Sequence, residues 1–375
     1  MRTTEGQVRL GYARGVIRLA LANRAGKAGQ VLRVAATYIG TVVGAGFASG
    51  QETLRFFGAY GKMGMIGIAL ATLLFCTYGI VVMELGRRLR ARSHREILHF
   101  ACGPYIGRAM DGIVTLFLGA TLTVMVAGGG AVFAEQFGIP QSIGTFLTAG
   151  LAGLTILRGM RGIMVANAVV VPLLTIAVVG LSGASIGHHG LGAILGETLP
   201  WPALAPVHSW FVAALLYVGY NLVLSISVLA PLGAEVQDSG VLVAGGLVGG
   251  LSLGVLAAGI KLAVSAHMPE IGQHEIPMLF LARLHARPVQ WMYALILWAE
   301  IYTTAIGCAY GFAGRMTEVF RGSYRGIVVM VTALSLLGSG FGFSTLLSFL
   351  YPLFGFITLI VLLCLSVIFV RRAPM

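Results

Sequence analysis

Apolar runs of about 20 residues recur along nearly the whole chain, separated by short polar or basic segments. Runs of this length are what membrane-spanning helices require, because about 20 apolar residues cross the hydrocarbon core of a bilayer. The pattern predicts an all-α integral membrane protein. The ten predicted spans cover residues 31–58, 63–86, 111–136, 142–157, 162–183, 208–231, 240–266, 289–313, 324–340 and 345–370.

The first predicted span is interrupted by glycine. Residues 40–50 contain four glycines, and the run continues into Gln51 and Glu52. Glycine destabilises a helix by roughly 1 kcal/mol relative to alanine. Unwound backbone at membrane depth is tolerated only where it is buried in protein or lines a cavity. We therefore predict a broken first helix, and in secondary transporters such breaks bind substrate and coupling ion.

The sixth predicted span is irregular too, with Gly219 among polar and aromatic residues and Pro231 near its end. Ten spans divide as five plus five, and an odd number of spans in each half inverts the second half relative to the first. Paired Gly or Pro interruptions at corresponding positions of two halves indicate a transport site. The pattern predicts a 5+5 inverted repeat with broken first and sixth helices.

The same pattern divides the chain into segments. The predicted parts are a cytoplasmic basic segment over 1–30, a first five-helix repeat over 31–183, an extracellular loop over 184–207, a second repeat over 208–370 and a cytoplasmic tail over 371–375. Residues 8–24 form either a basic amphipathic helix on the inner leaflet or a disordered tail. Residues 267–288 are expected to be an ordered cap on the outer side.

Composition excludes a soluble protein, because hydrophobic residues make up 57% of the chain and charged residues only 10%, against roughly 25% charged in soluble domains. The net charge of +12 is compatible with nucleic-acid binding. The basic residues, however, lie mainly in the segments on one side of the spans, as the positive-inside rule describes. We therefore predict a multi-pass protein of the bacterial cytoplasmic membrane with both termini inside, no nucleic-acid partner, and a small-molecule substrate.

The sequence contains no pattern typical of an enzyme or a metal centre. Its four cysteines lack CxxC spacing, which argues against a metal site or a disulfide framework. No HExxH motif of the metalloproteases is present in the sequence. The GxSxG pattern occurs at residues 183–187 and 250–254, but both matches lie in or at the end of apolar runs and not at the strand-to-helix turn that the hydrolase motif requires. We expect no catalytic residues and no cofactor.

The helix break has a chemical use. A helix that restarts after Gly44-Ala45-Gly46 presents free N–H groups that suit a carboxylate, and the preceding half-helix presents carbonyls that suit sodium or an ammonium group. An amino acid or related zwitterion is the predicted substrate. The predicted substrate-binding residues are Gly44, Ala45, Gly46, Phe47, Tyr217, Gly219, Tyr220 and Asn221.

Three further residues are candidates for gating or coupling. Gln51 and Glu52 end the first span; Glu52 either lines the external vestibule or pairs with Arg55 at the interface. Glu300 lies within a span, where a carboxylate is costly and indicates function. It either adds charge to an ion site, carries a coupled proton, or pairs structurally with a tyrosine or arginine. Lys261, by contrast, is expected to extend toward the outer interface.

The first span resembles the broken first helix of the sodium-coupled leucine-transporter fold, within the amino acid–polyamine–organocation superfamily. The symporter pattern G-N-A-V-G-x-G-N-x-x-R corresponds to Gly40-Thr41-Val42-Val43-Gly44-Ala45-Gly46-Phe47. Residues 38–52 are more closely similar to the signature of the bacterial YkvI family of membrane proteins. The chain departs from the symporters at Phe47 and Gly50, where they have an asparagine and an arginine, so the resemblance does not imply their first sodium site or their external arginine gate.

The resemblance implies a second sodium site. It would use carbonyls of Gly40, Val43 and Glu300 and the hydroxyls of Thr303 and Thr304, which are oxygen ligands suited to a hard cation. Threonine hydroxyls in membrane helices also commonly bond back to their own helix, which is the alternative for this pair. The combined prediction is a sodium-coupled symporter; the alternatives are a proton-coupled transporter using Glu300 and a membrane ligand sensor that does not transport.

Overall fold

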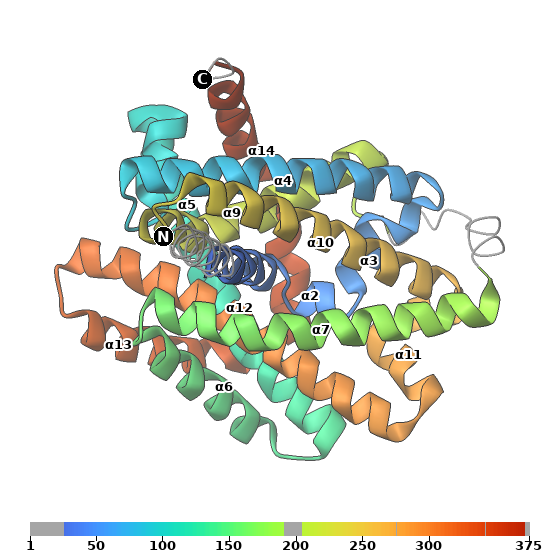
Figure 1. Cartoon of the computed structure of the whole chain (residues 1–375). Coiled ribbons are helices and arrows are strands. Elements are labelled where there is room, and N and C mark those ends of the chain that lie inside the picture. The colour runs from blue at the N-terminus through green and yellow to red at the C-terminus, as the bar shows by residue number, and fades with distance from the viewer. Residues whose placement is uncertain (1–25, 191–204, 275, 342, 372–375) are drawn as a thin grey trace, which may run out of the picture.

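The computed structural model describes residues 26–190, 205–274, 276–341 and 343–371. Over these ranges the chain forms helices and short connections (Figure 1). A helix over 26–42 comes first. The others are α2 (Ala45–Ala48), α3 (Gln51–Phe56), η1 (Gly58–Tyr60), α4 (Met63–Leu89), α5 (His94–Phe137), α6 (Gln141–Ile156), α7 (Met160–His189), α9 (Trp210–Glu235), α10 (Ser239–Ser265), η3 (Glu270–Gln273), α11 (Pro277–His285), α12 (Arg287–Phe320), α13 (Tyr324–Gly338), η4 (Ser339–Phe341) and α14 (Phe343–Arg371).

The first span is broken where the sequence predicts. The helix over 26–42 ends before Val43 and Gly44, and α2 continues for one turn. Gly50 then adopts φ +84°, a left-handed conformation that glycine takes without the steric penalty of a side chain. A second short helix, α3, follows. The two interruptions, at residues 43–44 and 49–50, leave α2 as a single helical turn between them, and every residue from Val43 to Gly50 is buried.

The sixth span is not broken, contrary to the prediction. α9 runs without interruption from Trp210 to Glu235, with Pro231 inside it. Every residue from Leu216 to Gly233 is buried, so packing outweighs the low helix propensity of glycine and proline. Gly219 instead permits close packing, since a Cβ there would lie 3.0 Å from the Thr358 hydroxyl of α14.

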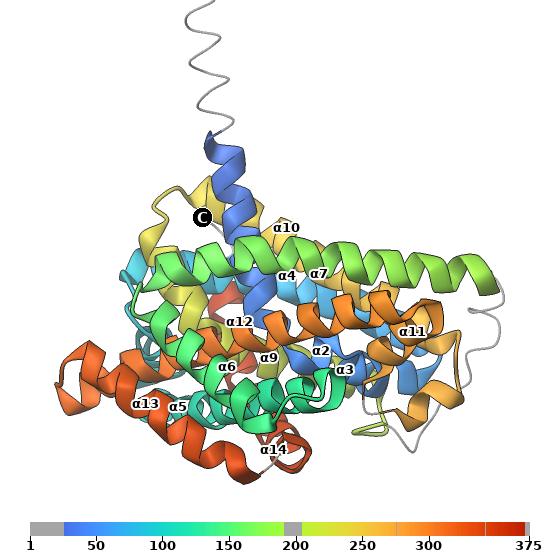
Figure 2. The ribbon, with the colours of Figure 1, turned by 90° about the horizontal axis from the view of Figure 1, so that it is seen from below.

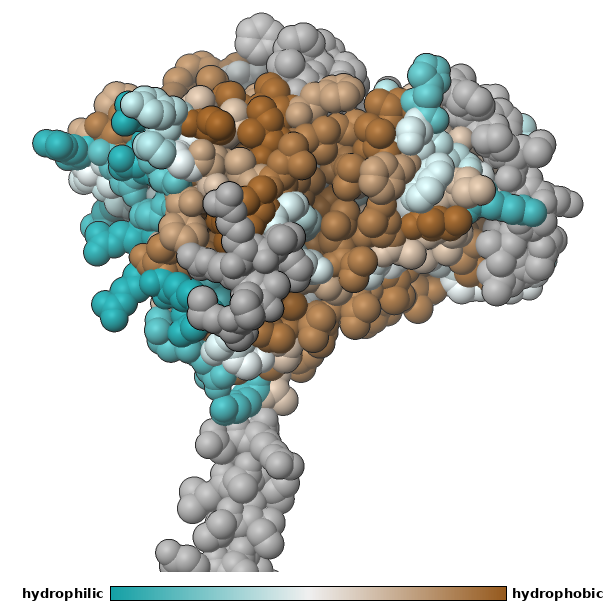
Figure 3. Space-filling model, turned by 90° about the horizontal axis from the view of Figure 1, so that it is seen from above, coloured by the Kyte–Doolittle hydropathy of each residue, from teal (hydrophilic) through white to brown (hydrophobic). Residues whose placement is uncertain are grey.

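The remaining predicted spans coincide with helices. Six helices, α4, α5, α7, α9, α10 and α12, are long and apolar enough to cross a membrane, and shorter apolar segments occur in α6, α13 and α14. Hydrophobic surface covers the middle of the molecule, and hydrophilic side chains gather toward its two sides (Figure 3). The chain is therefore a multi-pass membrane protein. The full count of ten spans, the domain limits and the inverted repeat stay predictions.

Two boundaries differ from expectation. α5 begins at His94, within the predicted inner connection, and turns at Gly103 (φ +78°) before Pro104. α7 continues to His189, so residues 184–189 are helical rather than part of the outer loop. The predicted cap over 267–288 is ordered, as η3 and α11. Residues 8–24, and most of the outer loop, lie outside the described residues.

α9 lies at the centre and packs against α4, α5, α12 and α14 (Figures 1 and 2). Its approach to α4 is close because two glycines face main-chain atoms across the contact. A Cβ on Gly86 would lie 2.2 Å from the carbonyl oxygen of Ala230, and one on Gly233 would lie 1.9 Å from that of Met83. Close backbone contact through small residues is typical of helix packing in membranes.

A charged cluster joins α5 to α12. Arg315 of α12 donates to both carboxylate oxygens of Asp111 at 2.5–2.9 Å, and His94 lies 3.2 Å from the same carboxylate. Such a two-pronged arginine contact fixes geometry as well as charge. The cluster therefore fixes α5 against α12.

Candidate functional site

A small buried cavity lies beside the break in the first span. Its volume is about 20 Å³, enough for a water-sized atom. Four structural units converge on it: the first span, α5, α9 and α12. Its lining residues are Thr41, Val42, Gly44, Glu52, Thr121, Tyr220, Asn221, Leu224, Thr304, Gly307 and Cys308. A solute larger than water would require these helices to separate.

The structure brings some of the predicted ion ligands together. The Thr304 hydroxyl donates to the Val43 carbonyl at 2.9 Å, which joins α12 directly to the break. Gly44 lies against the same side chain, because a Cβ there would be 3.2 Å from Thr304 Oγ1. Thr303 donates to the Glu300 carbonyl at 3.0 Å, one turn earlier on α12. A hydroxyl that donates keeps lone pairs that can face a cation.

Glu300 and Gly40 complete the predicted set, each in its own environment. The Glu300 side chain is fully buried, with one oxygen 3.3 Å from the Thr303 hydroxyl and the other without a hydrogen-bond partner among the described residues. Gly40 faces α7, where a Cβ would lie 2.2 Å from Asn167 Oδ1. Asn167 is buried, and neither of its amide atoms has a partner in the part of the chain that the structure describes.

Carbonyl and hydroxyl oxygens meet at Val43 and Thr304, and oxygen atoms of this kind are the ligands that a hard cation prefers. Buried oxygens that lack partners, such as one of Glu300 and that of Asn167 among the described residues, are costly. Sodium would be transported cargo here rather than a resident cofactor. Val43 and Thr304 are the two predicted ligands that touch across helices.

Glu52 lies inside the molecule rather than at an interface. Its side chain is buried and lines the cavity, while Arg55 is exposed, and no ion pair joins the two in the described structure. The carboxylate interacts with the side chains of Tyr220 and Asn221. The alternative of an interfacial pair with Arg55 is therefore wrong, because within α3 the Glu52 side chain is buried and the Arg55 side chain is exposed.

The predicted substrate residues separate into two groups. Gly44, Tyr220 and Asn221 line the cavity. Ala45, Gly46 and Phe47 are buried beside it without lining it. Tyr217 packs in an aromatic cluster with Phe56, Phe57 and Phe75, and Gly219 faces α14.

Several lining residues were not predicted. Thr41 and Val42 lie within the glycine motif itself, and Gly307 and Cys308 follow Thr304 by one turn of α12, so the spacing of helix faces could have indicated them. Thr121 carries no comparable signal in the sequence. Lys261 does not extend to the interface as expected; it is fully buried, and its ammonium makes no hydrogen bond within the described ranges.

Residues of the second half of the chain form hydrogen bonds with the segment after the break, residues 48–51. Tyr293 donates its hydroxyl to the Ala48 carbonyl at 2.6 Å, and the Met278 amide donates to the Ser49 carbonyl at 2.9 Å. Gln51 donates through Nε2 to the His274 carbonyl, also at 2.9 Å. Gln51 therefore ties α3 to the cap that contains η3 and α11. This arrangement closes the predicted outer side of the cavity.

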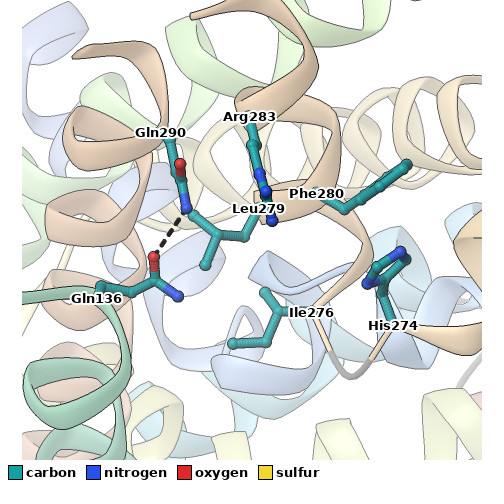
Figure 4. Close-up of a pocket in the computed structure, with 7 residues that line it drawn as sticks. All are labelled: Gln136, His274, Ile276, Leu279, Phe280, Arg283 and Gln290. Carbon is teal, nitrogen blue, oxygen red and sulfur yellow. Dashed lines mark hydrogen bonds between the residues drawn. The ribbon is translucent and has the colours of Figure 1, made fainter. Parts of the chain in front are cut away.

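A larger, open pocket lies beyond that closure, with a volume of about 280 Å³. Its residues come from the end of α5, the cap and the start of α12 (Figure 4). Gln290 donates to Gln136 at 3.1 Å across one side, and the His274 ring stacks on Phe280 at the other. The lining residues are Gln136, His274, Ile276, Leu279, Phe280, Arg283 and Gln290.

Comparison with solved structures shows the fold. MhsT in complex with L-phenylalanine superposes with a TM-score of 0.69, at 15% identity, over 92% of this chain and 89% of MhsT. A Na⁺-coupled sialic acid symporter in an outward-open state gives 0.65 at 11% identity, over 88% of this chain and 77% of that one. Mhp1, a nucleobase-cation-symport-1 family transporter, gives 0.55 at 13% identity, over 82% and 70%.

Comparison of sequences identifies the relatives. No family model matches the chain. The membrane protein YkvI of Bacillus subtilis (strain 168), named as uncharacterized, is 33% identical over 334 residues, which are 88% of this chain and 94% of YkvI. YyaD of the same strain is 27% identical over 331 residues, 87% of this chain and 93% of YyaD. Neither the relatives nor the structural neighbours are named as enzymes. The chain belongs to the YkvI family of membrane proteins, and it has the fold that the sodium-coupled leucine-transporter group shares.

Proposed function

We propose that this protein is a secondary active transporter that couples sodium entry to the movement of an amino acid or similar small organic solute. The observation that carries the proposal is the contact of the Thr304 hydroxyl with the Val43 carbonyl at the wall of a buried cavity. It joins the irregular backbone of the first span to a polar site on α12. Unwound backbone of this kind is tolerated in a membrane where it lines a cavity, and transporters bind ions and substrates there.

The structural neighbours support this class of function. One is described as Na⁺-coupled and another as a cation symporter, and all three were solved with a small organic molecule bound. At such low sequence identity, the structural similarity supports the same fold but does not identify the substrate. We assign this protein to the cytoplasmic membrane with both termini inside, on the distribution of its basic residues.

Proton coupling is the second candidate, and Glu300 favours it. One oxygen of this fully buried carboxylate has no hydrogen-bond partner among the described residues. A carboxylate in that position is stabilised either by a cation beside it or by a proton on it. The two couplings therefore predict different ion dependence for the same site.

The first test measures sodium binding. We expect the melting temperature of the detergent-purified protein to be higher in sodium than in potassium, because a ligand that binds only the folded state stabilises it. An amino acid library added in sodium should enlarge the shift for one solute. A shift that depends on pH and not on sodium would support proton coupling instead.

The second test measures uptake into proteoliposomes with the Thr303→Ala, Thr304→Ala double variant. Sodium-dependent uptake should be lost, because two hydroxyl ligands are removed. Thr317→Ala is the matched control: its hydroxyl bonds to the Ala313 carbonyl of the same helix α12, away from the cavity. Full sodium-dependent uptake by the double variant would remove the assignment of the site. Binding without any uptake would indicate a sensor.

A further inference from the structure

Glu52 brings a carboxylate into the centre of the cavity wall. Only 6% of the residue is exposed, and it lines the cavity with Tyr220 and Asn221 of α9. A Cβ on Gly46 would lie 2.2 Å from Glu52 Oε1, so the carboxylate lies directly on the segment after the break. That segment is where the sequence pattern places the carboxylate of a zwitterionic substrate. The position is therefore already taken by an acid of the protein itself.

No basic side chain of the protein neutralises this acid in the described ranges. Glu52 takes part in none of the ion pairs found there. Arg55 is exposed, and the ammonium of buried Lys261 makes no hydrogen bond or ion pair with Glu52 in the part of the chain that the structure describes. The carboxylate interacts with the neutral side chains of Tyr220 and Asn221, and its second oxygen has no hydrogen-bond partner among the described residues. A buried carboxylate that no opposite charge neutralises is strongly unfavourable, so a bound cation would be favoured at this point.

The surroundings of Glu52 suit an organic ammonium group. Tyr220 offers an aromatic ring, which attracts a cation through its face, and Asn221 offers an amide. Val42 and Leu224 supply apolar wall for a hydrocarbon portion. The predicted sodium ligands Val43 and Thr304 are different residues, whose oxygens bond to each other, so sodium and an ammonium group need not compete for the oxygens of Glu52.

We propose that Glu52 binds the positively charged amino group of the transported solute, and that the solute is an organic amine without a neighbouring carboxylate. A zwitterionic amino acid would place its own carboxylate in the same small cavity as Glu52, and like charges at close range repel strongly in a site of low dielectric constant. This inference rests on the proposed function, since it names the substrate class of the same site.

The test compares amines with the amino acids that differ from them by one carboxylate. The pairs are phenethylamine with phenylalanine, 3-methylbutylamine with leucine, and 1,5-diaminopentane with lysine. Each is titrated against the purified protein in sodium while the melting temperature is measured. We expect an amine to raise the melting temperature and its carboxylated partner to have at least about tenfold weaker affinity.

Variants at Glu52 locate the effect. Glu52→Gln keeps the shape but removes the charge, and it should weaken amine binding by at least about tenfold. Glu52→Asp keeps the charge and should retain part of the affinity. Glu270→Gln is the control, because Glu270 is an exposed carboxylate in the cap outside both pockets. Should Glu52→Gln fail to fold, the wild-type preference between amine and amino acid still decides.

Three results would overturn the inference: no amine in the panel binds, the amino acids bind better than the amines, or Glu52→Gln binds the amine as well as wild type. Sodium-driven uptake of an amino acid without amine binding would leave the proposed function in place and remove only this inference. Amine binding that Glu52→Gln abolishes, without sodium-driven uptake, would keep the inference and remove the proposed transport function.

Discussion

A missing methyl group at Gly46 determines where the Glu52 carboxylate lies. An alanine there would place Cβ 2.2 Å from Glu52 Oε1 and 2.7 Å from its carboxyl carbon. We expect Gly46→Ala to displace the carboxylate and to lower the melting temperature, as overpacking of a buried site costs typically 1–3 kcal/mol. In a Glu52→Ala background the same substitution should cost much less, because the clashing atoms are gone.

Gly112→Ala on α5 is the control for this comparison of Gly46→Ala in the wild-type and Glu52→Ala backgrounds. Nothing lies within 4 Å of a Cβ at Gly112, so alanine there should leave the melting temperature unchanged or raise it slightly, through its higher helix propensity. Equal losses from Gly46→Ala in both backgrounds would show that Glu52 is not the group it meets. Thermal unfolding monitored by intrinsic fluorescence is sufficient for all of these variants.

The sequence predicts the acid at residue 52 but not its direction. Glu52 and Arg55 lie three residues apart in the same short helix, α3, a spacing that allows an ion pair. The left-handed Gly50 and the space over Gly46 decide otherwise, and both depend on packing with α9 and on Met278. The ion ligands depend less on such detail, because Val43 precedes the break and Thr304 belongs to a regular helix.

At the level of helices, α4 and α9 meet through two glycines that face main-chain atoms. We expect Gly233→Ala and Gly86→Ala each to lower the melting temperature, since a Cβ would lie 1.9 Å or 2.2 Å from a carbonyl oxygen that cannot move independently of its helix. The double variant should lose less than the sum of the two, because the first substitution already separates the helices.

Gly180→Ala on α7 is the matched control at this level. A Cβ there has no atom within 4 Å, and the substitution should be neutral or slightly stabilising. If Gly233→Ala unfolds at the same temperature as Gly180→Ala, the close contact of α4 with α9 does not contribute to stability.

Hydropathy predicts the positions of the helices well and their continuity less well. The break in the first span was confirmed: the helix over 26–42 ends before Val43 and Gly44, although residues 43–50 are all buried. The break in the sixth span was wrong because Gly219 and Pro231 lie in a helix that is buried on all sides. Helix propensity depends on the local sequence, whereas the packing of α9 against four other helices cannot be predicted from the residues of α9 alone.

For the whole molecule, the distribution of basic residues predicts which side faces the cytoplasm. Glu270, in the cap, precedes α12 along the chain, and Arg321 follows it directly. Both residues are exposed. In a variant whose native cysteines are replaced by serine, we expect a membrane-impermeant maleimide to label Glu270→Cys in intact cells and Arg321→Cys only after lysis. Labelling in the reverse order would invert the proposed orientation.

The hydrogen bonds that hold the segment after the break have a mechanical consequence. Ala48 and Ser49 accept from Tyr293 and Met278, and Gln51 donates to His274. This short piece of the first span is thereby linked to the cap and to α12, while the backbone connects it to the helix over 26–42 through Val43 and Gly44. A tilt of the cap would carry the piece along as a lever pivoting at those two residues, and the cavity would open without any change in the helix over 26–42.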